Sequence, residues 1–185
     1  MRKIRSTKVL TLLAFCVTVN FIGAFLALTL RLPIYLDSIG TIAASCILGP
    51  SYGILTGITG NLISAMNGDI YSLFFLPVQI IIGLLSGIMY RKGYLKGKKV
   101  ILGVAGFSIL ASIAGSFIAA MVFGGVTSSG STYIVQVLNN LGMNEVLSVF
   151  ITQGFTDYAD KLVSVLLVNS AVLKVGKYLN KNIIA

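Results

Sequence analysis

Four side chains that could bind a solute lie within one helical turn: Asp157, Tyr158, Asp160 and Lys161. In a helix, Asp157 and Lys161 share a face, because residues four apart are neighbours. Two carboxylates and one ammonium can hydrogen-bond a polar, uncharged or zwitterionic ring. The same residues also suit a capping acid with an interfacial ion pair, in which Lys161 reaches water. At membrane depth, the cost of burying ionisable groups favours contact with a solute.

Other polar side chains are candidates for the same site, and each has a structural alternative. Asp37 precedes an apolar segment and is either a solute ligand or a helix N-cap. Asn61 lies within an apolar segment, where its amide serves a solute or an interhelical hydrogen bond. Asp69 and Tyr71 lie at a predicted turn and contact either a solute or solvent. Two further candidates are Gln79 and Gln136.

The composition excludes several classes of protein. Of the 185 residues, 56% are hydrophobic and 10% are charged, whereas soluble domains are about 45–50% apolar and about 25% charged. So few charges cannot cover a water-facing surface, and disordered chains are richer in charge. The chain has no His, so a Cys and His zinc site and a Ser-His-Asp catalytic site both lack an essential residue. The sequence therefore predicts an integral membrane protein that is not an enzyme and holds no metal or cofactor.

The net charge of +9 has a membrane pattern. Twelve of the fourteen Lys and Arg flank long apolar runs in three clusters: Arg2, Lys3, Arg5 and Lys8; Arg91, Lys92, Lys96, Lys98 and Lys99; Lys174, Lys177 and Lys181. Basic residues beside apolar runs mark cytoplasmic loops. This distribution predicts no nucleic-acid partner and places both termini and the loop at 91–99 in the cytoplasm.

Six apolar segments predict six transmembrane helices, at about residues 9–30, 38–48, 51–66, 70–90, 100–123 and 157–173. The second and third are short, so they must tilt or pack beside a polar interior. Residues 124–131 are mostly Gly, Ser and Thr and predict a loop that either gates a pocket or is a simple linker. We interpret residues 132–156 as a loop with a partial helix lying at the membrane interface. The whole chain, 1–185, then forms one all-α membrane domain with its acidic residues towards the outer side.

Several short motifs follow one another in this order of helices. An apolar segment ending in Asp37 is followed by the turn Leu48-Gly49-Pro50, and then by Gly57-x-x-x-Asn61. Together with the chain length, the six helices and the segment from Thr156 to Lys161, these motifs resemble the substrate-binding S-component of energy-coupling factor (ECF) transporters. The resemblance covers nearly the whole chain.

The resemblance implies a function and partners. Such proteins bind a vitamin or similar micronutrient with high affinity in an outward-facing pocket. They dock on a membrane scaffold (T) subunit that is driven by two ATPase (A) subunits. In the family, the first helix often carries A-x-x-x-A as its docking surface, and here Gly23-x-x-x-Ala27 has that spacing. Small residues four apart let two helices approach closely, and Ala111-x-x-x-Gly115 is a rival with the same spacing.

We therefore expect the substrate-binding subunit of an ECF-type importer in a bacterial plasma membrane, surrounded by lipid. Its substrate would be a vitamin or related micronutrient, including nucleobase- or nucleoside-like compounds. The chain has no G-x-x-x-x-G-K-[ST] motif, so ATP hydrolysis by that route requires other subunits. The alternative is a stand-alone secondary carrier or small channel, although an ion-coupled carrier needs an acid near mid-membrane. An aspartate pair from Asp157 and Asp160 has poor spacing for catalysis on one water.

Overall fold

The computed structural model describes residues 6–182, and side chains from residue 7 to residue 171. The basic cluster of Arg2, Lys3 and Arg5 lies outside the described residues, as do the side chains of Lys174, Lys177 and Lys181. Over residues 6–182 the chain forms eight α-helices, one short 3₁₀ helix and no strand. The helices are α1 (Ser6–Thr29), α2 (Ile39–Ile47), α3 (Pro50–Met66), α4 (Tyr71–Phe74), α5 (Leu76–Arg91), α6 (Val100–Phe123), α7 (Ser131–Asn140) and α8 (Glu145–Asn182), with the 3₁₀ helix at Gly97–Lys99. The all-α prediction is confirmed.

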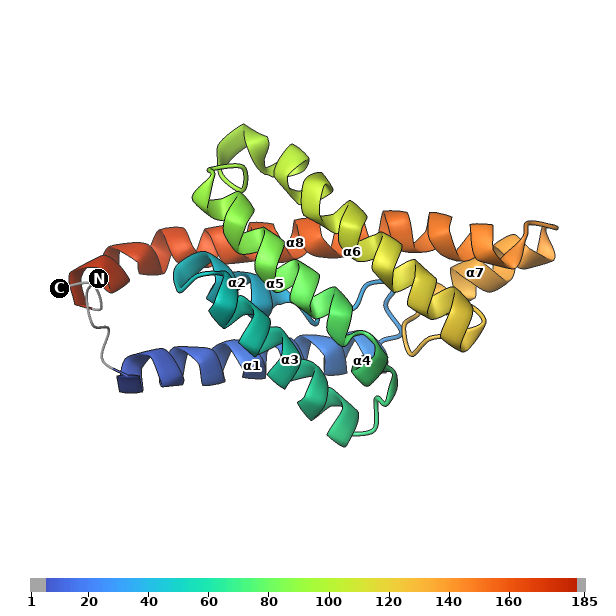
Figure 1. Cartoon of the computed structure of the whole chain (residues 1–185), viewed down its shortest axis with the longest axis horizontal. Coiled ribbons are helices and arrows are strands. Elements are labelled where there is room, and N and C mark those ends of the chain that lie inside the picture. The colour runs from blue at the N-terminus through green and yellow to red at the C-terminus, as the bar shows by residue number, and fades with distance from the viewer. Residues whose placement is uncertain (1–5, 183–185) are drawn as a thin grey trace.

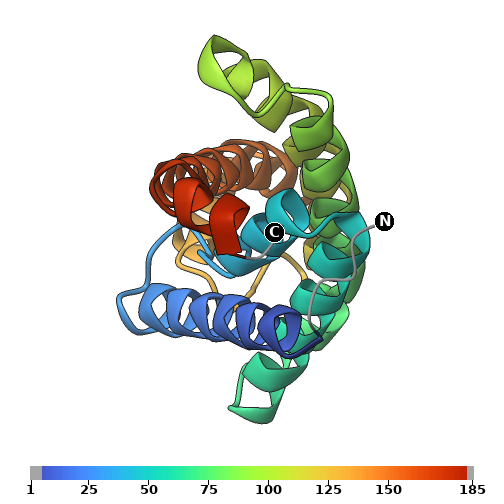
Figure 2. The same cartoon turned by 90° about the vertical axis from the view of Figure 1, so that its left-hand side faces the viewer.

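Two long helices frame the molecule. Figure 1 shows α1 and α8 along the long axis, with the start of α1 and the end of α8 at the same end. Helices α3, α5 and α6 run obliquely across them, and α3 packs on α5 while α6 packs on α8. The short α2 contacts α1, α3, α5 and α8, and Figure 2 shows it enclosed among them.

The distribution of side chains suits an apolar surrounding. Fully buried apolar residues at the helix contacts include Ile42, Ile82 and Phe107. Large apolar side chains also cover the outside, including Phe117 on α6 and Phe25 on α1. By length and composition, two stretches among the described residues could cross a membrane, Thr7–Thr29 and Gly97–Phe123. Such extensive exposed apolar surface calls for a covering partner or lipid.

The predicted helix at 70–90 is interrupted. Helix α4 ends at Phe74 and α5 begins at Leu76, with Phe75 between them. Pro77 lies in the first turn of α5, where its missing N–H costs no helical hydrogen bond. The proline therefore favours a new helix start at this point, and Phe75 lies at the break between the two helices.

The largest difference from the sequence prediction concerns residues 132–156. Most of this segment is helical: it contains α7, and α8 already begins at Glu145 instead of residue 157. Asn144 caps α8, because its side-chain oxygen accepts hydrogen bonds from the N–H groups of Val146 (3.0 Å) and Leu147 (3.4 Å). Helix α8 has 38 residues and is about 57 Å long at 1.5 Å per residue. It therefore extends well beyond the thickness of a bilayer core.

Candidate functional site

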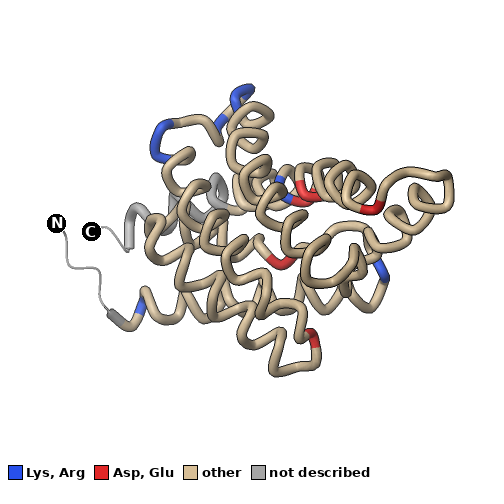
Figure 3. Tube along the Cα trace, turned by 45° about the vertical axis from the view of Figure 1, so that its right-hand side comes forward, with Lys and Arg blue, Asp and Glu red and all other residues tan. Residues whose placement is uncertain are grey.

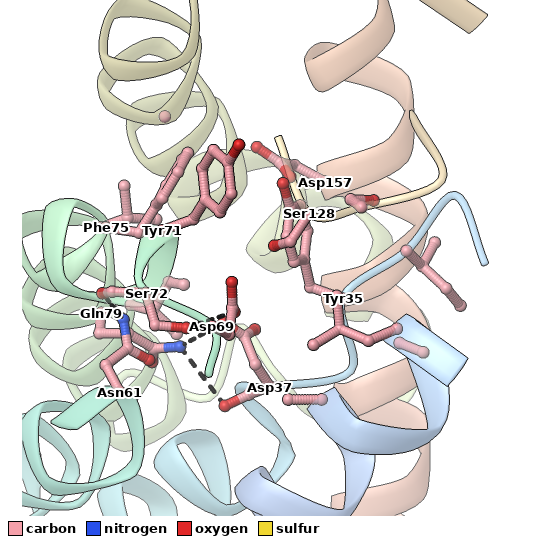
Figure 4. Close-up of a pocket in the computed structure, with 18 of the residues that line it drawn as sticks. Tyr35, Asp37, Asn61, Asp69, Tyr71, Ser72, Phe75, Gln79, Ser128 and Asp157 are labelled. Atoms are coloured by element: carbon pink, nitrogen blue, oxygen red, sulfur yellow. Dashed lines mark hydrogen bonds between the residues drawn. The ribbon is translucent and has the colours of Figure 1, made fainter. Parts of the chain in front are cut away.

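A cavity opens between the helices near the non-helical segments 30–38 and 124–130. Its volume is about 30 Å³, room for about two water molecules, so the residues around it must move apart to admit a larger solute. Figure 4 shows labelled side chains from several helices and both segments arranged around it. Its polar lining comprises Tyr35, Asp37, Asn61, Asp69, Tyr71, Ser72, Gln79, Ser128, Ser129, Gln153, Asp157 and Lys161.

Asp37 enters the cavity from segment 30–38, and Gln79 on α5 orients it. The Gln79 amide nitrogen donates to Asp37 Oδ2 at 2.9 Å, while Gln79 Oε1 accepts from the Thr41 hydroxyl at 3.0 Å. Asp37 Oδ1 is buried without a hydrogen-bond partner among the described residues. Burial raises the pKa of the Asp37 carboxyl above its usual value, and the Lys161 ammonium opposes that shift. Asp37 is therefore held in place by one oxygen and leaves the other available.

Asp69 reaches the cavity from the turn between α3 and α4. Its Oδ2 accepts from the Ser72 hydroxyl at 2.6 Å, and Asn61 on α3 donates to the Ser72 carbonyl at 2.8 Å. Asp69 Oδ1 is buried and has no partner in the described chain. The arrangement repeats that of Asp37: one carboxylate oxygen is anchored and the other is free to accept.

The cluster on α8 divides into two parts. Asp157 and Lys161 line the cavity. Asp160 is fully buried behind them, where Oδ1 accepts from the Leu36 N–H at 2.9 Å and Oδ2 pairs with the Lys161 ammonium at 2.5 Å. Asp160 therefore ties segment 30–38 to α8 and neutralises Lys161, and it does not line the cavity.

Two predicted site residues lie elsewhere. The Tyr158 hydroxyl points toward α6, 3.5 Å from the Ile101 carbonyl oxygen, and Gln136 is exposed on α7. Neither lines the cavity. The structure instead adds Ser72 and Gln153, which sequence reasoning missed. Gln153 falls in the stretch 132–156 that the sequence predicts as a loop with a partial interfacial helix, whereas the Asn144 cap starts α8 at Glu145.

Gly23 and Ala27 are buried inside the protein and do not lie on a surface where a partner could dock. Gly23 is buried, and a Cβ there would lie 2.1 Å from the Leu36 carbonyl oxygen. Ala27 is 3% exposed and lines the cavity. The small residues are used inside the fold, where they let segment 30–38 approach α1. The predicted docking role for this pair therefore does not agree with its position.

Segments 30–38 and 124–130 are joined over one side of the cavity. The Tyr35 hydroxyl donates to Thr127 Oγ1 at 2.8 Å, and the Gly130 N–H donates to the Leu32 carbonyl at 3.0 Å. On the exposed side, Arg31 donates to the Tyr133 hydroxyl at 2.6 Å. These bonds join residues about a hundred positions apart, so they form a cross-linked cover.

A family model described as "ECF transporter, substrate-specific component" matches residues 8–175. The chain belongs to this family. Searches of curated proteins and of solved structures found no match. The family places this S-component in a membrane and gives it a transport role, as the sequence resemblance indicated. Among the described residues, no group of three or more His, Cys, Asp or Glu side chains could hold a metal ion.

Proposed function

We propose that this S-component captures a small organic micronutrient in the cavity from outside the cell. Import would then require separate scaffold (T) and ATPase (A) subunits. The observation that carries the proposal is the pair of buried, unpartnered oxygens, Asp37 Oδ1 and Asp69 Oδ1, on two residues that line one cavity. Buried polar atoms are costly without hydrogen-bond partners. A bound solute supplies those partners.

The orientation that this function requires has six crossings: α1, α2, α3, the pair α4–α5, α6 and α8. The distribution of charges supports it. Figure 3 shows the basic loop between α5 and α6 towards the end where the termini lie, and the acidic residues in the middle and towards the other end, with two smaller basic positions among and beyond them. With the basic end in the cytoplasm, the cavity faces outward.

The test uses the full chain, purified in nanodiscs. Mass spectrometry should find a co-purified small organic compound, and adding that compound should raise the thermal unfolding temperature of stripped protein. Cells expressing the chain should accumulate it only when T and A subunits are co-expressed. Accumulation by liposomes that contain this chain alone would instead establish a stand-alone carrier.

A further inference from the structure

Several hydrogen-bond donors around the cavity are occupied by the protein itself, although the Ser128 hydroxyl has no partner among the described residues. The Gln79 amide donates to Asp37, and the Ser72 hydroxyl donates to Asp69. The Tyr35 hydroxyl donates to Thr127. Lys161 donates one of its three N–H groups to Asp160 and keeps the other two. The cavity therefore offers a bound molecule few donors from these groups.

Several hydrogen-bond acceptors around the cavity have no partner in the described part of the protein. Asp37 and Asp69 each keep one buried oxygen without a partner. Asp157 supplies a third carboxylate to the same lining and is 6% exposed. Figure 4 shows the three side chains around one space.

The ionisable side chains around the cavity include more acidic groups than basic groups. Within residues 7–171, the one ion pair formed by a lining residue joins Lys161 to Asp160, which stands behind the cavity. The single positive charge of Lys161 also attracts Asp37, but it stands against four carboxyl groups in all, Asp160 and the three that line the cavity. Burying uncompensated carboxylates is costly, and a bound counter-charge relieves that cost.

Gln153 is a second, independent sign of a missing ligand. It is 3% exposed and lines the cavity from α8. None of the other described residues forms a hydrogen bond with its amide. An amide offers both a donor and an acceptor. The Gln153 amide can therefore bind the edge of a ligand that carries both a donor and an acceptor.

We propose that the cavity selects an organic cation, an amidine, guanidine or protonated amino-heterocycle, whose N–H groups donate to Asp37 and Asp69. This inference rests on the proposed function. The flat body of the ligand lies against Tyr71 and Phe75, which line the cavity beside these acids. Charge-assisted hydrogen bonds and contact of a cation with aromatic rings both strengthen such binding.

The experiment uses stripped full-length protein in nanodiscs and the small-molecule fraction of yeast extract as the probe. After washing, retained compounds are released, identified by mass spectrometry and passed over a cation-exchange resin at pH 7. Retention of a compound that carries a positive charge supports the inference. Retention of only neutral or anionic compounds overturns the inference and leaves the proposed function standing. No retained compound overturns both.

Two substitutions test the contact residues with the captured compound. Asp69→Asn and Asp37→Asn keep an oxygen for Ser72 or Gln79 but turn an N–H donor towards the ligand. Each should weaken binding about 10- to 100-fold. Glu145→Gln is the matched control, because it removes an exposed carboxylate outside the cavity, and its affinity should be unchanged. Unchanged affinity in both Asp variants, with folding confirmed by thermal unfolding, contradicts the assignment.

Discussion

Two buried polar clusters lie side by side in this molecule and differ in how completely their atoms are paired. The first joins α1 to α2. Asn20 Oδ1 accepts from the N–H groups of Gly40 (2.6 Å) and Thr41 (3.2 Å), and its amide nitrogen donates to Thr41 Oγ1 at 2.8 Å. Asn20 thereby pairs two N–H groups in the first turn of α2, which have no partner within the helix. We call this paired cluster of Asn20, Gly40 and Thr41 the α1–α2 joint.

The second cluster is the cavity, where Asp37, Asp69 and Ser128 each leave a buried oxygen without a partner among the described side chains. Gln79 connects the clusters, since its Oε1 faces Thr41 and its Nε2 faces Asp37. The closed cluster satisfies the backbone and stabilises the fold. The open cluster keeps acceptors for a molecule that is not part of the chain. If this distinction holds, substitutions in the two clusters will affect stability and binding in opposite ways.

Asn20→Ala should have the largest effect on stability. It leaves the N–H groups of Gly40 and Thr41 without their partner, whereas the Thr41 hydroxyl keeps its bond to Gln79. Each unpaired buried N–H group costs about 1–3 kcal/mol. We expect the free energy of unfolding to fall by at least about 2 kcal/mol, measured by thermal or denaturant unfolding in detergent. Asn67→Ala is the control, because the exposed Asn67 amide only bonds the Ile63 carbonyl of its own helix. Equal losses in both variants would show that the α1–α2 joint has no special role.

Gly23→Ala tests whether the cavity depends on close packing behind segment 30–38. The new Cβ would meet the Leu36 carbonyl oxygen, so the segment must shift, at a cost of about 1–3 kcal/mol. Because Asp37 follows Leu36 directly, ligand affinity should fall as well.

The matched control is Gly154→Ala on α8, where a Cβ meets nothing within 4 Å. Alanine favours a helix over glycine by about 1 kcal/mol, so its stability should be unchanged or higher. If Gly23→Ala kept full affinity but failed to assemble with the scaffold subunit, the docking role predicted from the sequence would be restored.

Asp69→Asn should change stability in the opposite direction to Asn20→Ala. It removes one of three carboxylates around the cavity, so the ligand-free protein should gain about 0.5–2 kcal/mol, as substitutions at functional sites often do. Differential scanning calorimetry of stripped protein measures this gain. A clear loss of stability without ligand would place Asp69 with the structural residues.

The sequence predicted most of the helices and many of the cavity residues, and its failures have physical reasons. The uncharged run at 100–123 matches α6 residue for residue, because hydropathy dominates there. The start of α8 depends on a single capping side chain, Asn144, and a hydropathy pattern does not register it. Gln153 was missed with that start.

Tertiary contacts account for the remaining differences between the predicted and the observed roles of the polar residues. Asp157 and Asp160 are three residues apart on α8, yet one lines the cavity and the other bonds the Leu36 N–H. Asn20 pairs with the start of α2 across a chain reversal. Local sequence does not specify which buried polar side chain meets a partner and which is left open. That difference separates the two clusters.

Tyr35→Phe should have the smallest effect, because it opens one bond in the cover and leaves the rest. Thr127 keeps contacts with Thr132, whose hydroxyl accepts from its N–H at 2.9 Å. We expect a stability loss of about 1 kcal/mol and a ligand dissociation rate that rises about 2- to 10-fold, measured by stopped-flow exchange.

Tyr133→Phe is the control for Tyr35→Phe. It tests whether any lost bond between these segments speeds ligand release, or only a bond beside the cavity. It removes the exposed bond to Arg31, and neither of these two residues lines the cavity, so the dissociation rate should stay the same. Because the Tyr35 hydroxyl bonds Thr127 and its ring lines the cavity, its loss should loosen the ligand side of the cover. If both variants release ligand equally fast, the cover acts as one rigid unit. If neither does, the ligand leaves by another route, such as the second hollow that shares Asp69, Tyr71 and Ser128 with the cavity.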